Sequence, residues 1–376
     1  MPLKQYEIAT IDGDGIGPEV CQATVAVLRE ACGADLLNFS HHDGGADHYA
    51  RTGHVLPPDT FAACKTAHAI LHGAAGMPGI TYADGTEVGN DLHLQLRFKL
   101  DLYANVRPVR LWKGVRSPLR DWQAGQIDYV IVRENTEGLY ASRGGGINLR
   151  GEVCTDTLVV TRKGVERVAR FSFELSRKRQ GAPRDGKRRM TVCDKANILR
   201  SYAFFRAVCD EVAQEYGDVE IDYAYVDAMT VHLVKRPDYY DVIVAENMFG
   251  DIISDLGAAT IGGMGLSPSA ELGDHHGLFQ GAHGSAPDIA GQDLASPLAT
   301  ILSGALMLRW LGDRHDDTRL VSAADRVEQA VEQVLAEGDA VPRDLGGQAG
   351  CRAMTAAVIR RLATERQDTG IAETAT

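Results

Sequence analysis

Two carboxylates in residues 246–255 have the spacing of a metal site. Asp251 and Asp255 stand four residues apart in ENMFGDIISD, a stretch with helical periodicity, and therefore share one face of a helix. Like charges at this spacing cost a helix roughly a few tenths of a kcal/mol, and a divalent cation reverses the sign of that term. Oxygen ligands favour Mg²⁺ or Mn²⁺ over zinc. The alternative is a favourable interaction of acids with a helix N-terminus, which helps Asp251 more than Asp255.

A lysine and an aspartate follow two other strand-like runs. Lys195 stands in CDKAN and Asp227 in YVDAM. A lysine at the end of a buried strand is costly unless it is paired, and nearby positive charge lowers its pKa toward the range of a general base. A salt bridge between Lys195 and a carboxylate explains the sequence equally well.

Three arginines are candidates for binding an anionic substrate. Arg97, Arg107 and Arg133 lie in or beside extended segments, and Pro108 restricts Arg107 to extended backbone. Guanidinium groups bind carboxylates with two parallel hydrogen bonds, which suits a substrate that carries two carboxylates. Because the net charge of the chain is −12, an anionic substrate needs such a local cluster. The sequence alone leaves their convergence open.

The elements that must position these residues alternate between β-rich runs and helical patterns. Expected strands are residues 6–11, 68–72, 129–133, 190–193, 221–226 and 241–245, and expected helices include residues 18–31 and 165–177. This alternation predicts an α/β fold with a largely parallel sheet. Several strands end in polar residues, and ligands of open α/β sheets bind at the carboxyl ends of strands.

A glycine-rich turn, DGDGIGP at residues 12–18, follows the first strand. It differs from a dinucleotide-binding motif, because Pro18 stands where G-x-G-x-x-G requires its third glycine. We therefore interpret the turn as a tight loop at a helix N-terminus. The spacing argues against a Rossmann-type 2-hydroxyacid dehydrogenase.

Composition excludes several classes of protein. The 376 residues exceed one typical core, so two domains, or one large domain with insertions, are expected. The negative charge argues against a nucleic-acid partner. No apolar run approaches the length of a bilayer span, and the start has no signal-peptide pattern, so neither a membrane protein nor a secreted one is expected. Seven scattered cysteines without a C-x-x-C pair suit a reducing cytoplasm.

Seven segments together resemble the isocitrate/isopropylmalate dehydrogenase family, the β-decarboxylating dehydrogenases. They cover nearly the whole chain in order: GDGIGPEV at 13–20, LDLYANVRPVR at 100–110, VRENTEGLY at 132–140, CDKANIL at 193–199, YVDAMTVHLV at 225–234, ENMFGDIISDLG at 246–257 and HGSAPDIAG at 283–291. The resemblance implies an isopropylmalate dehydrogenase-like two-domain fold whose sheet is mixed, not Rossmann. It assigns residues 1–102 and 262–376 to a large domain with the NAD loop, and residues 103–261 to a smaller inserted domain with the dimer interface.

The same motifs imply substrate-binding and catalytic roles. Residues implied for the substrate are Arg97, Arg107 and Arg133 for its carboxylates and Asn90, His93 and Leu94 around its C3 substituent. Lys195 is the implied base for the C2 hydroxyl, and Tyr140 the acid that protonates the enolate after CO₂ leaves. Asp227 completes the catalytic set. Lys195 and Asp227 are expected from the partner subunit of a homodimer, in a cleft that both subunits build.

The motifs also imply the cofactors, NAD and Mg²⁺ or Mn²⁺. The metal ligands are Asp227, Asp251 and Asp255, and the NAD-binding residues are His283, Gly284, Ser285, Ala286, Asp288, Ile289 and Ser296. A carboxylate such as that of Asp288 accepts a hydrogen bond from a ribose 2′-hydroxyl and repels a 2′-phosphate. NADP-using relatives carry Lys-Tyr at the positions of Asp288-Ile289, so NAD is expected.

Departures from the family pattern bear on the substrate. Isocitrate-using relatives have Ser and Asn where this chain has Asp91 and His93, and an aspartate there should repel the third carboxylate of isocitrate. Bacterial isopropylmalate enzymes have leucine at the position of His93 and glutamate at that of Asn90. This polar lining predicts oxidative decarboxylation of D-malate, tartrate or a malate with a small or polar C3 substituent. The alternative is 3-isopropylmalate.

Two further positions depart from the family pattern, and one rival function is disfavoured. FQGAH at residues 279–283 replaces the usual FEPVH, so Gln280 stands in place of a glutamate. Ser296 replaces an asparagine that usually contacts adenine. A non-catalytic regulatory subunit on this fold is disfavoured, because Lys195, Tyr140 and the three aspartates are all present.

Overall fold

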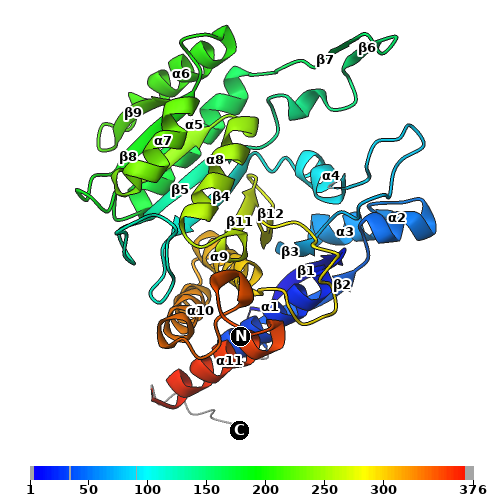
Figure 1. The fold of residues 1–376 in the computed structure, drawn as a ribbon, viewed down its shortest axis with the longest axis vertical. Coiled ribbons are helices and arrows are strands. Elements are labelled where there is room, and N and C mark those ends of the chain that lie inside the picture. The colour runs from blue at the N-terminus through cyan, green and yellow to red at the C-terminus, as the bar shows by residue number, and fades with distance from the viewer. Residues whose placement is uncertain (1–3, 34, 90, 369–376) are drawn as a thin grey trace.

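A ten-stranded mixed sheet runs through the computed structural model, which describes residues 4–33, 35–89 and 91–368 (Figure 1). The strands are β1 (Tyr6–Gly13), β2 (Leu37–His42), β3 (Ala69–Ala74), β4 (Ala104–Arg110), β5 (Asp128–Glu134), β6 (Ile147–Leu149), β7 (Val153–Thr155), β8 (Arg189–Asp194), β9 (Glu220–Tyr225), β10 (Val242–Ala245), β11 (Pro268–Leu272) and β12 (Gly277–Gly281). The α-helices are α1 (Gly17–Cys32), α2 (Ala46–Thr52), α3 (Pro58–Thr66), α4 (Asp91–Lys99), α5 (Arg162–Lys178), α6 (Arg200–Ala213), α7 (Val226–Lys235), α8 (Asn247–Thr260), α9 (Leu298–His315), α10 (Thr318–Glu337) and α11 (Cys351–Asp368). Single 3₁₀ turns are η1 (Tyr140–Ser142), η2 (Pro237–Tyr239), η3 (Met264–Leu266) and η4 (Arg343–Leu345).

The strand order is β2-β1-β3-β12-β11-β4-β5-β10-β8-β9. Pairing is parallel from β2 to β12 and again from β5 to β9, and it is antiparallel across β12, β11, β4 and β5. The mixed α/β fold is therefore confirmed, and the expectation of a largely parallel sheet holds only toward the two ends. The reason is local: β11 and β12 are joined by residues 273–276 alone, and so short a connection permits only antiparallel pairing.

All six expected strands and both expected helices are present, and every end lies within three residues of its expected position. Pro18 lies in the first turn of α1, where its missing N–H costs no hydrogen bond. Thr161 caps α5 by accepting a hydrogen bond from the Gly164 amide at 3.0 Å. In the described part of the chain, no helix is both long and apolar enough to cross a bilayer.

The two ends of the sheet are built from different parts of the chain. Residues 103–261 supply β4, β5, β8, β9 and β10, and the remaining five strands come from both sides of that segment (Figure 1). Helices α5 and α6 pack beside each other, as do α7 and α8. The right-handed connections between parallel strands put these two pairs on opposite faces of the sheet. The division into domains at residues 102 and 261 stays a prediction.

Candidate active site

Two aspartates and two arginines meet on one face of α8. Asp251 and Asp255 are the fifth and ninth residues of this helix, which follows the carboxyl end of β10 directly. Arg133, at the end of β5, donates from Nη1 to Asp251. Arg107 donates from Nη1 to Asp255 at 3.3 Å, and its Nη2 lies 3.6 Å from Asp251 Oδ1. The structure thus brings four predicted site residues together, with each aspartate against a guanidinium.

Neutral side chains that the sequence reading missed orient these arginines. Arg133 donates from Nε and Nη2 to Asn247 Oδ1, at 2.9 and 2.7 Å. Arg107 donates to Ser254 Oγ at 2.9 Å and to Asn105 Oδ1 at 3.3 Å. Asn247 and Ser254 belong to the same ENMFGDIISD segment as the two aspartates. Their place in that helix is the feature of the sequence that could have identified them.

Tyr140 is joined to the same cluster. Its hydroxyl donates to Asp251 Oδ2 at 3.0 Å, and the Arg133 guanidinium lies 5.2 Å from the centre of its ring. Burial and the Asp251 carboxylate raise the pKa of Tyr140 above its usual value. Because a phenol with a raised pKa keeps its proton at neutral pH, Tyr140 is able to serve as a proton donor.

Arg97 is the most deeply buried of the predicted substrate ligands. Its side chain is 2% exposed, and it donates from Nε and Nη2 to Glu271 at 3.0 and 2.7 Å. Its third nitrogen, Nη1, is buried and has no partner among the described residues. Burial and the positive charge of Arg97 lower the pKa of Arg133 to about 10. The two guanidinium groups therefore act on the same region, as an anion site requires.

Two of the residues expected around the C3 substituent, His93 and Leu94, lie on α4, about one turn before Arg97. Leu94 is buried, and burial together with the Arg97 charge lowers the pKa of His93 to about 3, so its imidazole is neutral. Asn90 lies outside the described residues. Asp91 accepts hydrogen bonds from Tyr82 Oη at 2.5 Å, from Gln95 Nε2 at 2.8 Å and from Arg143 Nη1. The aspartate expected to repel isocitrate is thus already paired with an arginine.

Lys195 and Asp227 form a separate pair. Lys195 Nζ lies 2.6 Å from Asp227 Oδ1, and the two side chains are 26% and 68% exposed. This hydrogen bond lowers the pKa of Asp227. No hydrogen bond or ion pair within the described residues links the pair to Asp251, and no three metal-ligating side chains gather there. Within a single chain, Lys195 therefore forms a salt bridge with a carboxylate, as the alternative interpretation expects. Its role as a base stays a prediction.

The predicted NAD loop packs on the glycine-rich turn before α1. The Ile16 amide donates to the Ser285 carbonyl at 2.8 Å, and a Cβ on Gly15, whose φ is +58°, would lie 2.0 Å from that oxygen. Ala286 and Ile289 pack against Ile16 and its neighbours. The glycine is therefore needed for close approach of two backbones, in agreement with a tight-loop interpretation.

The remaining NAD-loop residues differ in how firmly they are held. His283 Nδ1 lies 3.0 Å from the Gly284 carbonyl, and Ser296 donates to the Gly265 carbonyl at 3.4 Å. Asp288 is exposed, and its carboxylate makes no hydrogen bond or ion pair within the described ranges. A free carboxylate on this loop is suited to accept a hydrogen bond from a ribose hydroxyl.

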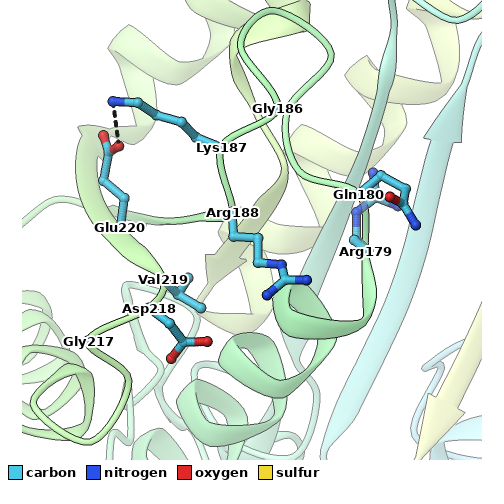
Figure 2. A pocket seen from close by; sticks show the side chains of 9 residues that line it. All are labelled: Arg179, Gln180, Gly186, Lys187, Arg188, Gly217, Asp218, Val219 and Glu220. Carbon is cyan, nitrogen blue, oxygen red and sulfur yellow. Dashed lines mark hydrogen bonds and ion pairs between the residues drawn. The ribbon is translucent and has the colours of Figure 1, made fainter.

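A pocket of about 580 Å³ lies elsewhere, at the amino ends of β8 and β9 (Figure 2). Its lining includes Arg179, Arg188 and Asp218, and Figure 2 shows Lys187 paired with Glu220, at 3.2 Å. The cluster around Asp251 and the pair of Lys195 and Asp227 lie instead where β5, β8 and β10 end. This pocket is therefore at the opposite edge of the sheet and holds none of them.

Comparisons with known proteins agree with this geometry. The model of the family described as isocitrate/isopropylmalate dehydrogenase matches residues 7–358. A 3-isopropylmalate/3-methylmalate dehydrogenase from Methanocaldococcus jannaschii is 44% identical, over 96% of this chain and 100% of the relative. A 3-isopropylmalate dehydrogenase from Clavibacter sepedonicus is also 44% identical, over 94% and 99%. The solved isocitrate dehydrogenase from Methylococcus capsulatus superposes with a TM-score of 0.82 at 36% identity, over 95% of this chain and 99% of that one.

Proposed function

The chain belongs to the isocitrate/isopropylmalate dehydrogenase family, and on that basis we propose that it oxidises and decarboxylates a 3-alkylmalate, with 3-isopropylmalate as the principal substrate. It is a β-decarboxylating dehydrogenase. The observation that carries the proposal is the convergence of Arg107, Arg133, Tyr140 and the two α8 aspartates at one edge of the sheet. The arginines can bind a carboxylate, the aspartates offer oxygen ligands to a cation, and Tyr140 is a protonated acid.

The comparisons favour 3-isopropylmalate, the alternative raised by the sequence, over D-malate or tartrate. Two features of α4 support an alkyl group at C3. His93 is an uncharged imidazole beside the buried Leu94, and the Asp91 carboxylate is held by other side chains. The side chains of this lining are polar in sequence, but they carry no unpaired charge in the structure. This lowers the free-energy cost of burying an alkyl group against them.

Each step of the reaction has a residue suited to it. Lys195 of the partner subunit accepts the proton of the C2 hydroxyl, and Tyr140 donates its proton to the carbon that loses CO₂. When bound, NAD accepts the hydride and Mg²⁺ or Mn²⁺ polarises the C2 oxygen. Asp251 and Asp255, which pair with arginines here, would hold the cation, and Arg107 and Arg133 would then be free to bind a substrate carboxylate. The site is therefore neutralised before and after binding.

We propose a homodimer in which each subunit completes the site of the other. Lys195 and Asp227 carry the missing base and metal ligand, and both are partly exposed. Apolar side chains are exposed on α7, the helix that carries Asp227, and on the neighbouring α8. Among them are Val231 and Val234 on α7 and Ile252 on α8. Such a patch on a soluble fold marks a protein interface. Because all seven cysteines are free, a cytoplasmic location is proposed as well.

The enzyme is expected to prefer NAD over NADP. The free Asp288 carboxylate repels a 2′-phosphate, so kcat/KM should be higher with NAD, and replacing Asp288-Ile289 with Lys-Tyr should shift the preference toward NADP. Replacing Asp274, an acid on another loop, with Lys is the matched control and should leave the preference unchanged. Equal kcat/KM for the two cofactors in the wild-type enzyme would show that the ribose is recognised elsewhere.

Substrate choice is tested by a panel of diacids, read as kcat/KM with NAD and Mn²⁺. The expected order places 3-isopropylmalate and 3-methylmalate above D-malate and tartrate, with isocitrate last. His93→Leu should raise activity on 3-isopropylmalate relative to D-malate by about tenfold, since each buried methylene contributes ~1–3 kcal/mol of discrimination. Lys99→Leu, at an exposed position at the end of the same helix, is the control. A wild-type preference for D-malate would contradict the proposed substrate and support the main prediction from sequence.

A further inference from the structure

Glu271 is a carboxylate that no motif singled out, and it lies completely inside the protein. It belongs to β11 and is 0% exposed. Its two oxygens accept both hydrogen bonds from Arg97, one from Asn135 Nδ2 at 3.0 Å and one from Gln280 Nε2 at 3.5 Å. Although burial opposes ionisation, the Arg97 charge holds the pKa of Glu271 at about 2. It is therefore a buried anion at neutral pH.

This carboxylate fixes the orientation of Arg97. Because Nε and Nη2 are both bound to Glu271, the guanidinium plane cannot rotate, and Nη1 is the nitrogen left over. That atom is buried and has no partner among the described residues. A buried charged donor without an acceptor is costly. A carboxylate of a diacid substrate would supply the acceptor that Nη1 lacks.

Strand pairing explains why a glutamate at position 271 can do this. In the antiparallel pair of β11 and β12, Ser269 lies opposite Gln280 and Glu271 lies opposite Leu278. Residues 269, 271, 278 and 280 therefore share one face of the sheet. The family usually has glutamate at the position of Gln280. In this chain an amide stands at position 280, and the carboxylate beside it is that of Glu271 on the neighbouring strand.

We propose that Glu271 is a positioning residue for substrate binding, which holds Arg97 so that Nη1 meets a substrate carboxylate, and that it replaces the glutamate usual at position 280. The inference rests on the proposed function, because it takes the ligand of Arg97 to be a dicarboxylate. Asn135 and Gln280 hold the glutamate in place, and neither carries a charge that competes with Arg97.

The test compares the wild-type enzyme with Glu271→Gln and with the double variant Glu271→Gln, Gln280→Glu, which exchanges the amide and the carboxylate. Glu271→Gln should raise the KM for 3-isopropylmalate by about 10- to 100-fold, as expected for loss of a charged hydrogen-bonding partner. The KM for NAD should stay within about twofold. The double variant should return the substrate KM to within about threefold of wild type, since a carboxylate again reaches Arg97. A purely structural role would lower the melting temperature and kcat without this selective change in KM.

Glu271→Gln with an unchanged substrate KM, or a raised KM that Gln280→Glu does not restore, overturns the proposal. If Glu271→Gln does not fold, the double variant decides alone, and a high KM or a failure to fold contradicts the inference. Failure of the proposed function is recognised separately, because the wild-type enzyme would then turn over none of the diacids. In that case, equal thermal stabilisation of wild type and a folded variant by 3-isopropylmalate with Mn²⁺ would overturn the role of Glu271.

Discussion

Alanine in place of Lys195 is expected to lower kcat by about 10²–10⁴-fold, the usual contribution of a positioned general base. The ammonium group is paired with Asp227 at 2.6 Å, and the side chain of that aspartate is 68% exposed. An exposed pair of this kind contributes little to stability. The melting temperature and NAD binding should therefore stay close to wild type while turnover is lost.

The matched control for this variant is Lys187→Ala, which removes a lysine paired with Glu220 at 3.2 Å near the opposite edge of the sheet (Figure 2). It should keep nearly full activity. Retention of more than about a tenth of wild-type kcat by Lys195→Ala would contradict its role as the base. Single-turnover measurements keep product release from hiding the effect.

Asparagine in place of Asp251 should raise the Mn²⁺ concentration needed for half-maximal activity by at least about tenfold, because it removes one anionic oxygen from the cation. Asp251 also pairs with Arg133 and accepts the Tyr140 hydroxyl, so kcat should fall as well. Asp218→Asn, which breaks a surface pair with Arg177 at 2.5 Å, is the control. An unchanged Mn²⁺ titration would contradict a role for Asp251 as a metal ligand. The alternative, a favourable interaction with the helix N-terminus, would then remain.

The two variants together test the shared site. A mixed dimer of Lys195→Ala and Asp251→Asn chains has one intact site, because the lysine comes from one chain and the aspartate from the other. At an Mn²⁺ concentration too low for Asp251→Asn to turn over, mixing the two proteins after reversible dissociation should therefore recover up to about a quarter of wild-type activity. Recovery of none would show that one chain supplies both residues.

Much of the fold was predictable from sequence because hydrophobic periodicity and turn residues are local signals. Buried runs such as Val242–Ala245, flanked by polar residues, were recognised as strands. The antiparallel centre of the sheet was not, since β11 and β12 are short, and which strands pair depends on contacts distant in sequence. Family resemblance, not periodicity, indicated a mixed sheet.

Some site residues could likewise be predicted from local sequence signals, and others depend on contacts that form only in the folded chain. Arg133 could be selected from sequence because it ends a predicted strand, and Asp251 because it stands four residues before Asp255 on a predicted helix; both are local signals. Glu271 was missed, because its role depends on lying opposite Arg97 across 174 positions of sequence. The lowered pKa of His93 could not be predicted for a related reason. It follows from burial beside Arg97, and burial is a property of the folded chain.

The most direct test of the account is the stoichiometry of the reaction with 3-isopropylmalate and NAD. Purified enzyme with Mn²⁺ should release one CO₂ for each NADH formed, measured with substrate labelled at the carboxylate that leaves. Both products should disappear with a chelator and return with added Mn²⁺. NADH formed without CO₂, or turnover that a chelator leaves unchanged, would contradict the assignment of this protein as a metal-dependent β-decarboxylating dehydrogenase.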